Sequence, residues 1–290
     1  MTAEKPALIE RRYSKYCYDP IFVPLASVLL IEGYFIGGCG MKRLLLCVAF
    51  ILAASVVCSA QNFYFPQVAV GAYDGGSWRT TIFLSNGRSD TASGTIAFTK
   101  SDGTPFNSTW LDESGNPTGN GNTITFQLGP SESRRFTSVT DIPLTTGFAT
   151  VASNSLAVLG SEVFSNFDSA GNLIAEAGVS MSIPIGKQAI FIDTTNGFKT
   201  GVAIANPNTT AALHIHFEVM NTAGQMIMST VRDVPPSQHF ATFVHELFPG
   251  IPEMVGRLQF YCTNPIVSVG MRFDLSFVNF TTMPPLALLP

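Results

Sequence analysis

The sequence predicts an all-β protein made of two tandem antiparallel β-sandwiches, and three observations lead to this fold class. After residue 60, short runs of alternating apolar and polar residues recur about every ten residues, as strands do in sandwiches and barrels. Turns rich in Gly, Asn, Asp and Pro separate these runs. The stretches at residues 80–88 (TTIFLSNGR) and 200–208 (TGVAIANPN) are near copies, and they set the register of the two halves.

The composition fits exposed β-structure. Hydrophobic residues make up 46% of the 290-residue chain and charged residues only 12%, compared with about 25% charged in a typical globular domain. Net charge is −4, and Arg134-Arg135 is the only basic doublet after residue 60. Nucleic-acid binding requires clustered Lys and Arg to displace counterions, so the sequence argues against a nucleic-acid partner.

The N-terminal sixty residues contain the features of a secretory signal peptide. Residues 41–43 (MKR) form a positive region, residues 44–57 an apolar run, and residues 58–60 (CSA) a cleavage site of small residues. The apolar run is shorter than the roughly 20 residues that cross a bilayer. We therefore expect residues 41–60 to be a signal peptide cleaved after Ala60, which places the protein outside the cytoplasm, in the periplasm, at the cell surface or secreted. Residues 1–40 are interpreted as an over-extended start, with a genuine long leader as the alternative.

Removal of this segment would leave a mature chain with no stable membrane span and with one cysteine. Cys262 would then have no internal disulfide partner. It lies in the strand-like run at residues 257–263, and free cysteines are usually buried. The sequence therefore predicts a buried thiol.

Copy 1 spans residues 61–182. Its predicted strands lie at residues 63–70, 78–86, 94–100, 123–128, 134–139, 147–153, 156–165 and 173–182. Because Pro66 has no amide proton to donate, the first of these is predicted to be an edge strand.

A linker at residues 183–188 leads to copy 2 at residues 189–290. The predicted strands of copy 2 lie at residues 189–193, 198–206, 211–220, 226–231, 239–244, 256–262, 266–274 and 277–283. One helical turn is expected at residues 244–248, ended by Pro249-Gly250. A repeat of about 110 residues is typical of an Ig-like or fibronectin-III-like sandwich rather than a solenoid.

Several short motifs carry a resemblance. They are W-x-T-T-I-x-L-x-N at residues 78–86, G-x-I-x-F-x-x-x-D-G at 94–103, E-A-G-V at 176–179, G-x-A-I-A-N-P at 201–207 and H-E-L-F-P-G at 245–250. Together they resemble uncharacterised secreted tandem β-sandwich proteins of environmental bacteria, over about residues 65–290. The resemblance implies a β-sandwich fold and export. Because the shared positions are strands, turns and core residues, it transfers no functional residues.

The segment at residues 107–122 departs most clearly from the two-fold repetition. It places Trp110 near Asp112, Glu113 and Asn116. An exposed indole on a polar loop could stack on a sugar ring, and the three oxygen-bearing side chains could ligate calcium. The segment is thus a candidate ligand-binding site. The alternative is a long hairpin whose tryptophan folds back onto the sheet.

His214, His216 and Glu218 form a candidate metal site. Their i, i+2, i+4 spacing puts them on one face of a strand, and two imidazoles with a carboxylate suit a divalent metal. Copy 1 has no such ligands at the equivalent positions. The alternative is an ordinary solvated strand face.

Catalytic motifs are weak. Glu162, Asp168 and Glu176 are the candidate carboxylates for a glycosidase, which needs two at a defined separation. The sequence contains no G-x-S-x-G motif. We interpret His239 and His245 as turn or surface histidines.

These observations favour an exported non-catalytic module for cell-surface interaction, with a glycan or protein partner at the copy 1 insertion. We expect no cofactor. The alternatives are a purely structural spacer or assembly module and a polysaccharide-acting hydrolase.

Overall fold

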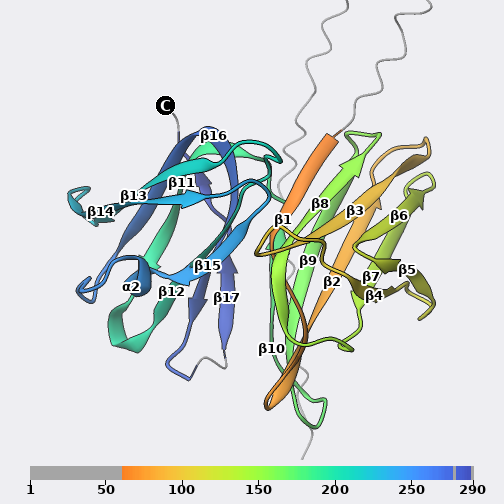
Figure 1. Ribbon diagram of the computed structural model, residues 1–290, viewed down its shortest axis with the longest axis horizontal. Coiled ribbons are helices and arrows are strands. Elements are labelled where there is room, and N and C mark those ends of the chain that lie inside the picture. The colour runs from red at the N-terminus through yellow and green to blue at the C-terminus, as the bar shows by residue number, and fades with distance from the viewer. Residues whose placement is uncertain (1–60, 277–278, 289–290) are drawn as a thin grey trace, which may run out of the picture. The chain divides into compact units, whose positions relative to one another are not determined.

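The computed structural model describes residues 61–276 and 279–288, and its fold is all-β with two antiparallel sheets. Figure 1 shows the two sheets with their strands labelled. The expected leader and signal peptide, residues 1–60, lie outside the described residues. Among the described residues, no helix has the length and apolar character needed to cross a membrane.

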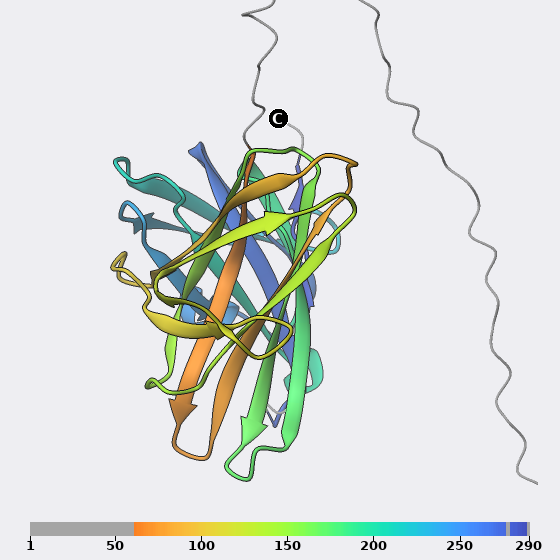
Figure 2. The same ribbon diagram turned by 90° about the vertical axis from the view of Figure 1, so that its right-hand side faces the viewer.

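The first sheet has ten strands that fold into two layers. The strands are β1 (Gln61–Tyr73), β2 (Gly76–Asn86), β3 (Ala92–Lys100), β4 (Ser108–Leu111), β5 (Pro117–Gly121), β6 (Thr123–Leu128), β7 (Ser133–Ser138), β8 (Thr145–Ser153), β9 (Val158–Asp168) and β10 (Leu173–Ser180). One layer has the order β1-β8-β3-β6, and the other β10-β9-β2-β7-β4-β5. The end of β1 also pairs with β2 and so joins the layers. Figure 2 shows the β1–β2 and β9–β10 turns, orange and green, side by side at one end.

The second sheet has eight strands, also in two layers. The strands are β11 (Ile185–Asp193), β12 (Lys199–Ala205), β13 (Leu213–Asn221), β14 (Met226–Val234), β15 (His239–Phe243), β16 (Val255–Phe273), β17 (Phe280–Met283) and β18 (Leu286–Ala287). One layer has the order β14-β13-β16-β11-β18, and the other β15-β12-β16-β17. A 3-10 turn (Thr195–Gly197) precedes β12, and the expected helical turn is present as α2 (Val244–Leu247).

Strand pairing in the two sheets corresponds strand for strand. The order β6-β3-β8-β1 matches β14-β13-β16-β11, and β7-β2-β9-β10 matches β15-β12-β16-β17. The layout of the strands differs from the expected one in three main ways. The strands expected at residues 256–262 and 266–274 are one continuous strand, β16, which changes sheet partners partway along. β11 begins at Ile185, inside the expected linker. Residues 107–122 form the β4–β5 hairpin, which has no counterpart in the second sheet.

The expectation of an edge strand holds for residues 63–70. This part of β1 is the outer strand of the layer β1-β8-β3-β6 and pairs with β8 alone, apart from one bridge between Tyr64 and Ser182, whereas residues 71–73 pair with β2. The register of its pairing with β8 shifts between Phe65 and Val68, on either side of Pro66. The missing proline donor is therefore accommodated by a bulge in an edge strand.

Each sheet encloses its own apolar core between its layers. Alternation explains the first core: Ile82 and Leu84 of β2 face Phe63 and Phe65 of β1 across it. The second core is built likewise from Val202 and Ile204 of β12 with aliphatic and aromatic residues of β13 and β16. Cys262 is only half-buried and packs against this second core, which partly meets the expectation of a buried thiol.

Two pairs of buried polar residues fasten β2 and β12 in equivalent ways. The Thr80 hydroxyl donates to the carbonyl of Ala69 at 2.9 Å, and the Thr200 hydroxyl donates to that of Asp193 at 3.0 Å. The Asn86 amide donates to three carbonyls that include Leu128 and Gly129. These contacts tie the end of β2 to the end of β6.

Asn206 repeats this arrangement at the end of β12. Its amide donates to the carbonyls of Ala211, Val234 and Pro235 at 2.9 to 3.0 Å, and its side-chain oxygen accepts the Asn208 amide proton. Asn206 is fully buried. Asn206 therefore links the turn that follows β12 to the end of β14.

β12 is buried on both faces, because its second face packs against the first sheet. Gly201, Ala203 and Ala205 point to that side. Ala205 lies in a buried cluster with Tyr64 and Phe148 of the first sheet. Small side chains at alternate positions let the two backbones come close.

We expect Asn206→Ala to lower the free energy of unfolding by about 2–4 kcal/mol, because it removes a fully buried amide that donates to one buried and two part-buried carbonyls. Asn221→Ala is the matched control, since the Asn221 turn contacts are solvent-exposed; it should cost less than about 1 kcal/mol. Urea unfolding of both variants tests this, and equal losses would contradict the assignment.

Candidate functional site

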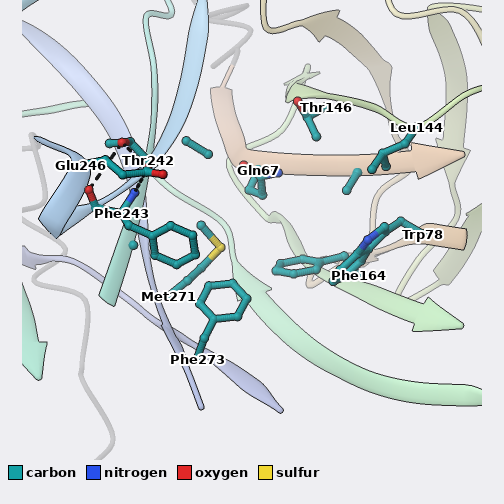
Figure 3. A pocket seen from close by; sticks show the side chains of 13 residues that line it. Gln67, Trp78, Leu144, Thr146, Phe164, Thr242, Phe243, Glu246, Met271 and Phe273 are labelled. Atoms are coloured by element: carbon teal, nitrogen blue, oxygen red, sulfur yellow. Dashed lines mark hydrogen bonds between the residues drawn. The ribbon is translucent and has the colours of Figure 1, made fainter. Parts of the chain in front are cut away.

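A cleft of about 360 Å³ with a mostly apolar lining lies between the two sheets. Figure 3 shows Trp78 and Phe164 of the first sheet facing Phe243, Met271 and Phe273 of the second. Its volume falls within the roughly 300–1,000 Å³ of ligand pockets, and its lining is mostly apolar with a few polar groups, as in such pockets.

Local strand geometry explains why these side chains converge. Trp78 lies on the same face of β2 as Ile82 and Leu84, but beyond the end of the closed core. On the other side, Met271 pairs across β16 and β12 with Gly201, which has no side chain to fill the space. The cleft therefore forms where large rings at the strand ends border a strand of small residues.

The aromatic rings form a continuous row across the two sheets. Neighbouring ring centroids lie 5.2 to 5.7 Å apart along the sequence Trp78, Phe164, Phe280, Phe273, Phe243 and His245. Phe164 is buried, whereas Trp78 is half-buried. Because neighbouring rings meet at angles from 11° to 72°, the row gives the cleft an apolar aromatic wall of stacked and edge-on rings rather than one flat face.

Glu246 is the carboxylate of the cleft. Its Oε2 accepts the Phe243 amide proton at 2.8 Å and the Thr242 hydroxyl proton at 2.9 Å. These bonds, the amide first, lower the pKa of Glu246. The carboxylate is therefore ionised at neutral pH and held in one orientation, with its second oxygen available as an acceptor.

A buried histidine supports the floor of the cleft. His239 Nε2 lies 3.0 Å from Gln67 Oε1, and Nδ1 lies 3.0 Å from Ser101 Oγ. Because an amide oxygen can only accept, the neutral ring carries its proton on Nε2, and Nδ1 lies beside the Ser101 hydroxyl, which also contacts the carbonyl of Thr146. Burial lowers the pKa of His239 to about 3. His239 thus joins the sheets as a neutral imidazole, and its interpretation as a turn or surface residue is wrong.

The Ser101–His239 contact has the spacing of a nucleophile and its base. A base with a pKa of about 3 has little affinity for a proton at neutral pH, and its other partner is an amide rather than a carboxylate. The pair therefore fits a structural role. His245, by contrast, is exposed and stacks on Phe243.

The structure overturns the exposed-tryptophan hypothesis. Trp110 is 1% exposed and stacks on Phe98, with ring centroids 4.2 Å apart. A buried indole is not available to a sugar. Asp112 instead accepts the amide protons of Ser114 and Asn116, which closes the hairpin turn, and Glu113 pairs with Arg134 at 3.1 Å.

The candidate metal site is not formed either. His214 and His216 do share an outward strand face, as expected, but His214 Nδ1 lies 2.5 Å from Asp233. Glu218 accepts from Gln259 and Tyr261. Within residues 61–276 and 279–288, no cluster of three or more His, Cys, Asp or Glu side chains has a geometry suited to a metal.

The three carboxylates proposed for a glycosidase do not meet. Glu162 points into the first core, Glu176 accepts a proton from Ser165 on the outer face of the same layer, and Asp168 closes the β9–β10 turn. Alternate strand positions face opposite sides, so Glu162 and Glu176 lie on opposite faces.

Glu162 is nevertheless unusual. It is fully buried beside Ile82 and Val179, and neither carboxyl oxygen has a hydrogen-bond partner among the described residues. Burial raises its pKa well above the usual range. The protonated form is therefore favoured, and ionisation would place an uncompensated charge in the core.

Sequence reasoning missed the residues that build the cleft: Gln67, Trp78, Phe164, Phe243, Glu246 and Met271. One signal was present. Positions 201, 203 and 205 are Gly, Ala and Ala, whereas positions 81, 83 and 85 of the matching strand are Thr, Phe and Ser. This difference marks a second buried face on β12.

Comparison with known proteins does not assign a function to the cleft. The chain matches no protein-family model and no curated protein sequence.

We expect Glu162→Gln to become more stabilising, relative to the native chain, as pH rises. The folded pKa is raised, so the stability that the carboxyl contributes is present below about pH 4.5 and is lost as pH increases toward that folded pKa. The difference should grow by about 1.4 kcal/mol per pH unit. Urea unfolding at pH 4, 5.5 and 7 measures it, with exposed Glu176→Gln as control. A difference independent of pH would contradict the prediction.

For His239 the dependence of stability on pH has the opposite sign. Its folded pKa of about 3 lies below the usual 6.5, so its contribution to stability is present above about pH 6.5 and is lost as pH falls toward 3. Relative to His239→Gln, the native chain should lose about 1.4 kcal/mol per pH unit over that range. Unfolding curves at pH 7.5, 6, 5 and 4 provide the measurement, and a difference between the two chains that does not change with pH would contradict the prediction.

Proposed function

We propose that this protein is an exported, non-catalytic β-sandwich protein that binds a carbohydrate in the cleft between its sheets. The carrying observation is the aromatic row, which starts at Trp78 and reaches Phe243 across the cleft. This placement replaces the copy 1 insertion, whose tryptophan is buried, as the proposed glycan site.

The chemistry of the lining supports a sugar. A pyranose ring has an apolar C–H face and an edge of hydroxyl groups. The cleft offers aromatic faces together with Thr146, Thr242 and the oriented carboxylate of Glu246. Charge-assisted hydrogen bonds from sugar hydroxyls to such a carboxylate are stronger than neutral ones.

The number of carboxylates in the cleft favours binding of a glycan without its hydrolysis. Glu246 is the only carboxylate among the described residues that line it, whereas hydrolysis of a glycoside ordinarily needs two, about 5–9.5 Å apart. The pKa of Glu246 is lowered, which suits an acceptor and does not suit a general acid. These observations argue against the hydrolase alternative.

The proposal includes a duplicated Ig-like unit and export. The matched strand orders and the equivalent contacts of Asn86 and Asn206 support duplication. The signal-like residues 41–60 support export to the periplasm, the cell surface or the medium.

A structural assembly module is the second candidate, because two observations favour it. Trp110 is packed into the core rather than presented to solvent. β14 pairs with β13 on one side only and carries the exposed side chains of Met226, Ile227 and Val231. Open edge strands can pair with another chain.

We expect Trp78→Ala to weaken glycan binding at least tenfold, or about 1.4 kcal/mol. The assay is a glycan array on the purified full-length chain, followed by calorimetry on the glycans that bind. Phe191→Ala is the matched control, because Phe191 is 63% exposed on the second sheet outside the cleft. Glu246→Gln, which preserves volume, should also weaken binding. If no glycan binds, the assembly module becomes the better reading.

A further inference from the structure

Gln67 is the only side-chain amide among the described residues that line the cleft between the sheets. The bulge in β1 explains its position. Phe63 and Phe65 point into the first core before the register shift, and Val68 and Val70 point into it afterwards. The extra residue reverses the alternation, so Gln67 faces the second sheet instead of the core. A bulge has therefore placed a polar side chain at the cleft.

His239 determines which end of the Gln67 amide is available to a ligand. The imidazole donates its Nε2 proton to Gln67 Oε1 at 3.0 Å. The Gln67 Nε2 group has no hydrogen-bond partner among the described residues, and it retains accessible surface. Because Gln67 is only 7% exposed and lines the cleft, this surface faces the cleft. The cleft therefore contains a neutral N–H donor that is held in one orientation.

The other polar side chains of the cleft complete its hydrogen-bonding pattern (Figure 3). The Thr242 hydroxyl donates to Glu246 Oε2, and the Thr146 hydroxyl lies 3.0 Å from Ser101 Oγ. Glu246 Oε1 and the Trp78 indole N–H group have no partner in residues 61–276 and 279–288. A ligand thus meets two neutral N–H donors and one carboxylate acceptor.

The surroundings of the amide favour a ligand group that only accepts. Ala69 lies two residues from Gln67 on the same face of β1, and Met271 lines the cleft from β16. A sugar hydroxyl that accepted from Gln67 would bring its own proton into this apolar part of the cleft, where an unpaired donor is costly. A carbonyl oxygen brings no such proton. The acetamido group of an amino sugar has this carbonyl, and its methyl group gains from apolar burial.

We propose that the sugar unit held in the cleft is an N-acetylhexosamine whose acetamido carbonyl accepts from Gln67 Nε2. A hydroxyl group of the same oligosaccharide donates to Glu246 Oε1. His239 is a positioning residue, because it keeps the amide oxygen of Gln67 turned away from the ligand. The inference rests on the proposed carbohydrate-binding function of the cleft and names the class of sugar.

Calorimetry of the full-length chain with chitotriose, the β-1,4-linked trimer of N-acetylglucosamine, tests the proposal. Cellotriose is the control ligand, because it has the same linkage and a hydroxyl in place of each acetamido group. We expect chitotriose to bind about tenfold or more tightly than cellotriose, since a site built for a hydrogen-bonding group rejects the analogue that lacks it. The deacetylated glucosamine trimer should bind more weakly than chitotriose, although its ammonium groups are attracted to Glu246.

Gln67→Glu should remove the preference for chitotriose over cellotriose, because the variant replaces the N–H donor with a carboxylate. Gln67→Met removes the donor without adding charge and should have the same effect. Gln127→Glu is the matched control, since Gln127 is exposed on β6 of the same sheet and lies outside the cleft. Thermal melts of the three variants separate loss of recognition from loss of folding.

The role of His239 is tested by the ratio of the two affinities. His239→Leu should lower the preference for chitotriose, because the freed amide can turn its oxygen toward the ligand. His239→Gln retains a side-chain N–H group that can donate to Gln67, so it should restore the preference. A purely structural role would instead weaken the binding of both trisaccharides equally.

Equal affinities for chitotriose and cellotriose would overturn the proposal and leave carbohydrate binding in place. Full preference for chitotriose in both Gln67 variants would also overturn it. Binding of the glucosamine trimer as tight as that of chitotriose would reduce the recognition to attraction between charges and would have the same consequence. If no oligosaccharide binds at all, the proposed function fails together with this inference.

Discussion

The close approach of β12 to the first sheet is the contact on which the rest of this structure depends. It depends on Ala203 and Ala205 at alternate positions of β12, because both are buried in clusters with residues of the first sheet and a larger side chain there would separate the sheets. Tight packing at this strand gives His239 its burial and leaves the aromatic cleft open beyond the small side chains. This interface therefore holds the two sheets together and also forms the candidate site.

Two buried ionisable groups oppose each other in their effect on stability. His239 lies between the two sheets. It makes the folded state more stable as pH rises, because it is neutral when folded. Glu162 lies in the first core. It makes the folded state less stable as pH rises, because its charged form is unsolvated there. As pH rises above about 4.5, the two contributions therefore change with opposite signs. His239 has two hydrogen-bond partners that explain its presence, whereas Glu162 has none among the described residues.

The cleft arises where the sheets meet. It is lined mainly by rings and contains one ionised carboxylate, Glu246. A separate groove over β2, β7 and β9 arises from the β4–β5 insertion, and its charged lining residues are Arg79, Arg135, Asp112 and Glu176. The two concave surfaces therefore differ both in origin and in charge.

The sequence by itself determined the class of fold, most strand positions and the correspondence of residues 80–88 with residues 200–208. Those features depend on period-two alternation and on turn chemistry, which are local. Tertiary structure alone decided that Trp110 is buried on Phe98, that Glu162 and Glu176 face opposite sides, and which rings line the cleft. These outcomes depend on how distant strands stack and how two sheets meet. Alternation along one strand specifies which side chains share a face, but not what that face packs against.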